Sequence, residues 1–233
     1  MEVSFEEERA KARRVRMTVF GAGVAVLAVL LSVMIIPAKA QQGPARASLA
    51  RQPDGSLVLA VPGVTQPVLD LYEDFDCPVC NELHGKVNTT LVRLAGEGRV
   101  KVVFHPVTIF SDEPMRSNSI RAAAAARCAP VESWLAYRDE LYAIQPAPHG
   151  TASGFTVEEL VAAGQRAGVK SPGFDRCVTS QERAESHLKD TATIRIEGTP
   201  TVRLNDMDLG DLAWSPATLE KAIDSVGGKL LES

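Results

Sequence analysis

The feature that most constrains the fold of this chain is the motif Cys77-Pro78-Val79-Cys80. It follows the apolar run Val68–Tyr72, which is typical of a strand, and proline suits the first turn of a helix. Two cysteines three residues apart on a first helical turn can form a disulfide with little backbone movement. The partial positive charge of a helix N-terminus also favours the thiolate of the first cysteine. The motif therefore predicts a strand, a turn and a helix with paired thiols at its tip.

A zinc site is the alternative use of such a pair, because two cysteines at this spacing can supply half of the ligands. Zinc sites usually need a second closely spaced pair. The chain holds four cysteines, and the other two, Cys128 and Cys177, stand alone and far apart. These spacings favour redox chemistry at the pair, and we expect no metal site.

The N-terminal segment predicts where the chain resides. Residues 17–36 are twenty residues without a charge, and at about 1.5 Å per residue they can cross a bilayer core of about 30 Å. Basic residues are concentrated before this segment. The positive-inside rule therefore predicts a cytoplasmic tail at 1–16, a transmembrane signal anchor at 17–37 and an extracytoplasmic remainder. The alternative is a cleaved signal peptide and a secreted protein, because Ala38-Lys39-Ala40 matches the A-x-A cleavage pattern.

Export bears on both the cysteines and the partners. All four cysteines follow the apolar segment, and thiols outside the cytoplasm can persist as disulfides. The simplest pairing joins Cys77 to Cys80 and Cys128 to Cys177, although other connectivities stay open and the second pair can also be buried free thiols. Residues 41–233 carry 19 lysines and arginines against 25 acids, a net charge of −6. This charge argues against nucleic acid or anionic lipid as the partner.

The pattern along the exported part predicts a tether at 38–55 and one mixed α/β domain at 56–233. A strand, a helix from Pro78 to about Ala95 and a strand at 99–104 form a βαβ unit, whose strands should be parallel. Asn205-Asp206 predicts a tight turn between two short strands, and Ser215-Pro216 starts a last helix. Between the βαβ unit and the final two strands and helix, we expect a helical insertion over about 107–195. Its helices are expected at residues 118–128, 132–144, 157–168, 174–180 and 181–194.

These features resemble the thioredoxin superfamily, and within it the DsbA-like thiol-disulfide oxidoreductases of the membrane-anchored bacterial type. Tyr72–Cys80 (YEDFDCPVC) is similar to that family's active-site segment, and Gly198–Val202 (GTPTV) is similar to its cis-proline loop. The 119 residues between Cys80 and Pro200 suit a family that inserts a helical subdomain there. A trans Pro200 is commoner on base rates, and the resemblance favours cis.

The resemblance implies an extracytoplasmic enzyme that introduces disulfides into exported proteins by dithiol-disulfide exchange at Cys77 and Cys80. Thr199 and Pro200 would hold the substrate chain, and no metal or organic cofactor is needed. The implied partners are reduced exported proteins and a quinone-linked membrane reoxidant of the DsbB or vitamin K epoxide reductase type. Val79 departs from the strongly oxidising members, which carry histidine there. A reductase or isomerase of the same fold, a redox-inert binding module and a copper chaperone are the alternatives, although copper chaperones usually carry CxxxC.

Three acids beside the motif, Glu73, Asp74 and Asp76, are candidates for tuning the cysteines. An acid near the sulfurs raises the pKa of a thiol and can move protons during exchange. The alternative is that all three are solvated loop residues. We expect Cys77 to be the attacked and more exposed sulfur, and Cys80 to be the buried one.

Overall fold

The computed structural model describes residues 46–150 and 152–231. The expected tail at 1–16, the expected anchor at 17–37 and the first part of the expected tether lie outside these residues. Within the described ranges, no helix has both the length and the apolar character to cross a membrane.

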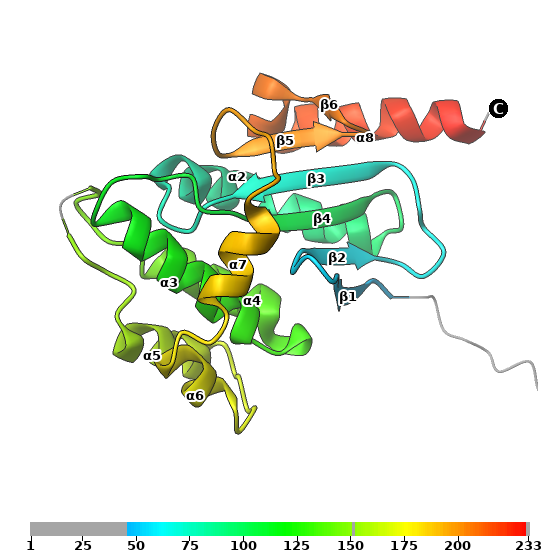
Figure 1. Ribbon diagram of the computed structural model, residues 1–233. Helices are drawn as coiled ribbons and strands as arrows, with labels where there is room; N and C mark the ends of the chain where they lie inside the picture. Colours follow the sequence, from blue (N-terminus) through cyan, green and yellow to red (C-terminus); the bar gives the residue numbers. More distant parts are fainter. Residues whose placement is uncertain (1–45, 151, 232–233) are drawn as a thin grey trace, which may run out of the picture. The chain divides into compact units, whose positions relative to one another are not determined.

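A mixed sheet forms the centre of the described part, with the strand order β1-β2-β4-β3-β5-β6 (Figure 1). β3 and β4 are parallel and are joined by helix α2 (Pro78–Gly96), which confirms the predicted βαβ unit. The other neighbouring pairs are antiparallel. The strands are β1 (Ser48–Arg51), β2 (Leu57–Ala60), β3 (Val68–Glu73), β4 (Lys101–Pro106), β5 (Thr201–Leu204) and β6 (Met207–Asp208).

Strand β1 differs from the prediction, which gives residues 38–55 to a tether. Ser48–Arg51 pair antiparallel with β2, so that Ser48 lies opposite Ala60 and Arg51 opposite Leu57. β1 has no buried apolar run, and its order comes from pairing with a neighbouring strand. Arg51 also donates from Nη2 to the carbonyl oxygen of Ala129 at 2.9 Å. The folded domain therefore begins before residue 56.

A helical insertion lies between β4 and β5, as the sequence predicts. In Figure 1 its helices α3 to α6 gather beside the sheet, and α7 leads the chain back to β5. Cys128 at the end of α3 and Cys177 in α6 are joined by a disulfide with their Cα atoms 5.8 Å apart. The helices of the insertion are α3 (Met115–Cys128), α4 (Trp134–Ala143), α5 (Val157–Arg166), α6 (Phe174–Thr179) and α7 (Ala184–Thr191), with a 3-10 turn at Val131–Ser133.

The core continues from the sheet into the insertion. Inward-facing residues of β3 and β4, such as Leu71 and Phe104, are fully or almost fully buried, as are Leu83 and Val87 of α2. The alanine run of α3, residues 122–126, is also buried, and its small side chains let α6 and α7 approach closely. After β6, the 3-10 helix Gly210–Trp214 leads into the last helix, α8 (Pro216–Leu231), which packs against α2. The paired cysteines lie between the end of β3 and the start of α2, at the edge of this core.

Candidate active site

The paired cysteines lie at the tip of α2, just beyond the end of β3. Cys77 is the extended residue before the helix, with φ −79° and ψ 116°, and Pro78 takes the first helical position. No side chain caps this helix end. The backbone N–H groups of Val79 and Cys80 therefore remain available to the Cys77 sulfur, and both help to lower the pKa of its thiol.

The two thiols differ strongly in acidity. The pKa of Cys77 is lowered from 9.0 to about 6, chiefly by a hydrogen bond from the Cys80 thiol and against the effect of burial. Burial raises the pKa of Cys80 far above its usual range, and the hydrogen bond to Cys77 adds to this. Their exposures differ little, at 4% for Cys77 and 2% for Cys80. The two cysteines therefore differ in the pKa of the thiol much more than in solvent exposure.

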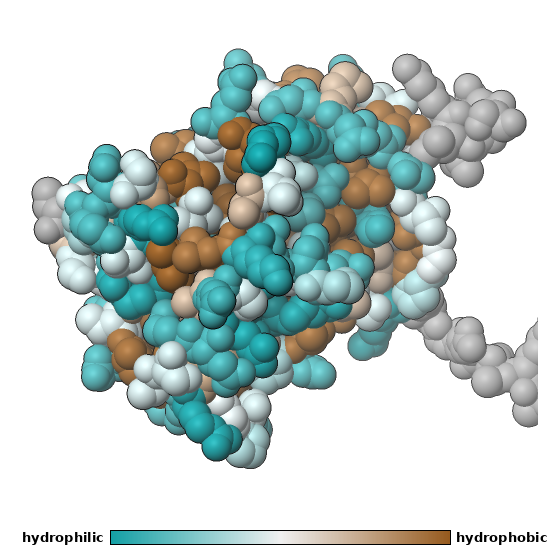
Figure 2. Space-filling model, viewed as in Figure 1, coloured by the Kyte–Doolittle hydropathy of each residue, from teal (hydrophilic) through white to brown (hydrophobic). Residues whose placement is uncertain are grey.

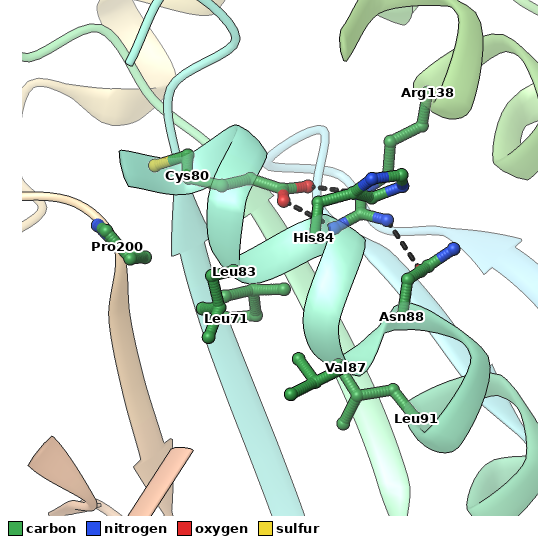
Figure 3. A pocket seen from close by; sticks show the side chains of 10 residues that line it. Leu71, Cys80, Leu83, His84, Val87, Asn88, Leu91, Arg138 and Pro200 are labelled. Atoms are coloured by element: carbon green, nitrogen blue, oxygen red, sulfur yellow. Dashed lines mark hydrogen bonds and ion pairs between the residues drawn. The ribbon is translucent and has the colours of Figure 1, made fainter. Parts of the chain in front are cut away.

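The loop before β5 faces the cysteines. The Thr199–Pro200 peptide bond is cis, and the carbonyl oxygen of Thr199 lies 3.4 Å from Cys77 Sγ. Pairing of β5 with β3, in which Tyr72 lies opposite Thr201, brings these distant segments together. Figure 3 shows Pro200 on its own chain segment across from Cys80.

Glu73 is part of a buried ion pair beneath the cysteines. Arg138 of α4 donates from Nε and Nη2 to the two carboxylate oxygens of Glu73 at 2.7 Å and 2.6 Å. The Tyr142 hydroxyl donates to Glu73 at 2.9 Å. Arg138 also donates to Asn88 of α2 at 2.8 Å (Figure 3). Glu73 therefore links β3 to α4, and Arg138 extends this link to α2. The interpretation of Glu73 as a solvated loop acid is wrong, and the partners Arg138, Tyr142 and Asn88 were not predicted.

Asp74 is buried beside Cys80. Its carboxylate accepts hydrogen bonds from the backbone N–H groups of Asp76 and Ile109, both at 2.9 Å. Its own N–H lies 3.5 Å from Cys80 Sγ. Burial is the largest influence on this carboxyl and raises its pKa from 3.8 to about 7. Asp74 is thus a buried group that can hold or release a proton near neutral pH.

Asp76, directly before Cys77, is also fully buried. One carboxylate oxygen accepts a hydrogen bond from Asn118 Nδ2 at 3.3 Å, and the other lies 3.3 Å from Nε2 of His149. Burial raises the pKa of Asp76, while His149 and Asn118 oppose the rise. The solvated-loop interpretation is therefore wrong for all three acids. His149 was not singled out from the sequence, since no local pattern connects it to the motif.

The surface around the cysteines is partly apolar. Val79 is 45% exposed and Ile109 is 38% exposed, and Figure 2 shows hydrophobic surface over the connection from β4 to α3. Beside the cis-proline loop lies an open groove of about 240 Å³. It is lined by Val107, Thr108, Ile109, Thr191, Ile194, Ile196, Glu197 and Gly198. Within the described residues, no group of three or more histidine, cysteine or acidic side chains is arranged to hold a metal ion.

Comparisons with known proteins agree with this geometry. The model of a family described as thioredoxin matches residues 65–225. Oxidised DsbA from Mycobacterium tuberculosis is 28% identical, with a TM-score of 0.63, over 78% of this chain and 93% of that chain. Reduced DsbG from the same organism is 29% identical, with a TM-score of 0.64, over 80% and 89%. BdbD from Bacillus subtilis, 17% identical with a TM-score of 0.63, shares the fold. No curated protein matches the chain in sequence.

Proposed function

Because this chain belongs to the thioredoxin family and is a DsbA-like thiol-disulfide oxidoreductase, we propose that it works outside the cytoplasm as an oxidase that introduces disulfides into exported proteins. The observation that carries the proposal is the unequal pair of thiols at the tip of α2. A Cys77 pKa of about 6 makes this sulfur a good leaving group. It also stabilises the reduced enzyme, and an enzyme with a stabilised reduced form is a stronger oxidant.

The proposed cycle starts from a Cys77–Cys80 disulfide. A substrate thiolate attacks the Cys77 sulfur, the bond between the two cysteines breaks, and Cys80 leaves with the electron pair and takes a proton. A second substrate thiolate then attacks the substrate sulfur of the mixed disulfide, which forms the substrate disulfide and releases Cys77 as a thiolate. The enzyme keeps two electrons, and a quinone-linked membrane protein of the DsbB or vitamin K epoxide reductase type removes them.

We assign the proton taken up by Cys80 to Asp74. Cys80 has a strongly raised pKa, so its thiolate is protonated as soon as it forms. Asp74 is fully buried and its backbone nitrogen lies 3.5 Å from the Cys80 sulfur. Its pKa of about 7 lets the carboxyl act as a proton donor near neutral pH. The raised pKa thus suits the carboxyl for supplying the proton without access of bulk water.

Thr199 and Pro200 are assigned to holding the substrate chain. The segment after them forms β5, so a substrate strand lying along the loop can add backbone hydrogen bonds in the manner of an extra strand. The neighbouring groove of about 240 Å³, with Ile109, Ile194 and Ile196 among its lining residues, can take an apolar side chain.

We further propose that residues 17–37 anchor the enzyme in the cell membrane with the catalytic domain outside, and that exported proteins in their reduced form are its substrates. The uncharged run and its preceding basic residues support the anchor. Cleavage after Ala40 would give a secreted enzyme with the same domain.

Val79 favours a second candidate function, a reductase or isomerase of the same fold. Its half-exposed side chain offers neither a charge nor a hydrogen bond to the Cys77 thiolate. Equilibration with glutathione buffers distinguishes the two. We expect a reduction potential between about −270 mV and about −120 mV, nearer the oxidising end.

The same measurement on Val79→His should give a more oxidising protein, because an imidazolium stabilises the thiolate. Val79→Leu serves as the control, since it keeps an apolar side chain, and its potential should match the wild type. A wild-type potential at or below about −270 mV, the value for thioredoxin, would replace the oxidase by the reductase.

A further inference from the structure

A histidine from the insertion lies against the residue that precedes Cys77. His149 Nε2 is 3.3 Å from Oδ2 of Asp76, and neither atom has a hydrogen-bond partner among the described residues. The Asp76 side chain has no exposed surface, whereas that of His149 is 25% exposed. The imidazole therefore has one side near solvent, and its buried Nε2 faces a carboxyl group that solvent does not reach.

Asn118 of α3 holds the loop that carries His149 in place. Asn118 Nδ2 donates to Asp76 Oδ1 at 3.3 Å and to the carbonyl oxygen of Ala152 at 3.1 Å, and Asn118 Oδ1 accepts from the N–H of Gly154 at 3.0 Å. One asparagine thus binds both the loop and the acid that His149 faces.

Two packing contacts restrict this loop further. The ring of Phe110 packs on the His149 ring with 5.3 Å between centroids. At Gly154 a Cβ atom would lie 2.2 Å from Pro146 Cγ, so only glycine fits there. The Phe110 contact helps to hold the His149 ring beside Asp76.

Few other charged or titratable groups face this pair in the described part. Arg121 of α3 acts on Asp76 over a longer range, but its guanidinium donates to Asn118 Oδ1 at 2.6 Å and to the carbonyl oxygen of Gly154 at 2.7 Å. From the motif segment come Asp74 and Cys77. Among the groups that favour the charged form of Asp76, His149 has the largest effect.

An ionised Asp76 next to Cys77 disfavours a thiolate there, because like charges repel in a poorly solvated site. A protonated His149 offsets that charge. We propose that His149 is a positioning residue that, through Asp76, sets how readily Cys77 exists as a thiolate. This inference rests on the proposed function, because it concerns the reactivity of the same sulfur. The CPVC motif itself has valine at position 79, and the proposed histidine contacts the residue that precedes the motif.

The test measures the pH dependence of thiolate absorbance in the reduced full-length protein. We expect His149→Gln to raise the pKa of Cys77 by about one unit and Asp76→Asn to lower it by a similar amount. In the Asp76→Asn background, His149→Gln should change nothing, because its effect passes through Asp76. His149→Lys, which keeps the positive charge, should restore a value close to the wild type.

His105→Gln is the matched control, since His105 is a half-buried histidine that also faces an acid, Asp70, at 2.7 Å. It should leave the Cys77 titration unchanged. An unchanged titration in His149→Gln, or an equal shift with and without Asp76, would overturn the inference. Failure of wild-type Cys77 and Cys80 to exchange with glutathione would instead overturn the proposed function, so the two failures are distinguishable.

Discussion

The two cysteine pairs of this chain lie in contrasting surroundings. Cys77 and Cys80 share one helical turn, are unbonded and have very different acidities. Cys128 and Cys177 belong to different helices, are 49 residues apart in sequence and are bonded to each other. A bridge across one turn restrains the unfolded chain little, whereas a bridge that closes a long loop restrains it strongly. Sequence spacing therefore separates a pair suited to exchange from a pair suited to stabilising the fold.

The sharpest test of this contrast is to remove one sulfur at a time. Cys80→Ser should accumulate mixed disulfides with substrate through Cys77, because no resolving thiol remains, and its turnover should be lost. Cys77→Ser should be inactive without trapping, because the buried Cys80 is not a thiolate. Non-reducing electrophoresis and mass spectrometry identify the adducts. Traps in Cys77→Ser instead would reverse the two roles.

Breaking the other pair should affect stability and leave the chemistry intact. The double variant Cys128→Ala/Cys177→Ala should lose about 4 kcal/mol of unfolding free energy in the chain-entropy model for a loop of this length. Denaturant unfolding measures this loss. Where the variant is folded, its Cys77–Cys80 potential should equal that of the wild type. A changed potential would mean that the two pairs are coupled.

The third prediction concerns Asp74, the buried acid close to the Cys77–Cys80 pair. Its pKa is about 7 in the folded state and near 3.8 in the unfolded state, so the folded chain holds an extra proton between these values. The folded wild type should therefore lose stability as pH rises from about 4 to 7 by roughly 2–4 kcal/mol relative to Asp74→Asn.

Urea unfolding at several pH values checks this dependence. The exposed Asp175 of α6 offers a control, since Asp175→Asn should follow the wild-type profile. Parallel profiles for wild type and Asp74→Asn would contradict the raised pKa, and with it the assignment of Asp74 as the proton source for Cys80.

Local signals in the sequence were enough to predict much of the fold. A strand followed by a proline-started helix predicted β3 and α2, and the parallel pairing with β4 followed from the βαβ rule. Asn205 and Asp206 adopt φ values of 48° and 66°, as the predicted tight turn requires. In each of these cases the residues that determine the structure are close together in the chain.

Features that depend on distant residues could not be predicted in this way. β1 forms because β2 lies beside it, and its own residues carry no strand pattern. Two of the acids near the motif, Glu73 and Asp76, have partners in the insertion, Arg138 and His149, that the local sequence does not indicate. Neither partner stands in a motif, and an arginine on a helix is usually solvated. A single sequence does not show which distant charges meet.

The buried pair of Glu73 and Arg138 has a consequence for conformational exchange in solution. The two charges come from the sheet and from α4, and both side chains are almost entirely shielded from water. A hinge motion of the insertion that separated them would leave two uncompensated charges, at a cost of about 3–5 kcal/mol. Fewer than about one molecule in a hundred would then occupy such an opened state at equilibrium. Substrates of different shape must therefore be accommodated by loops at the rim, while α4 stays in register with the sheet.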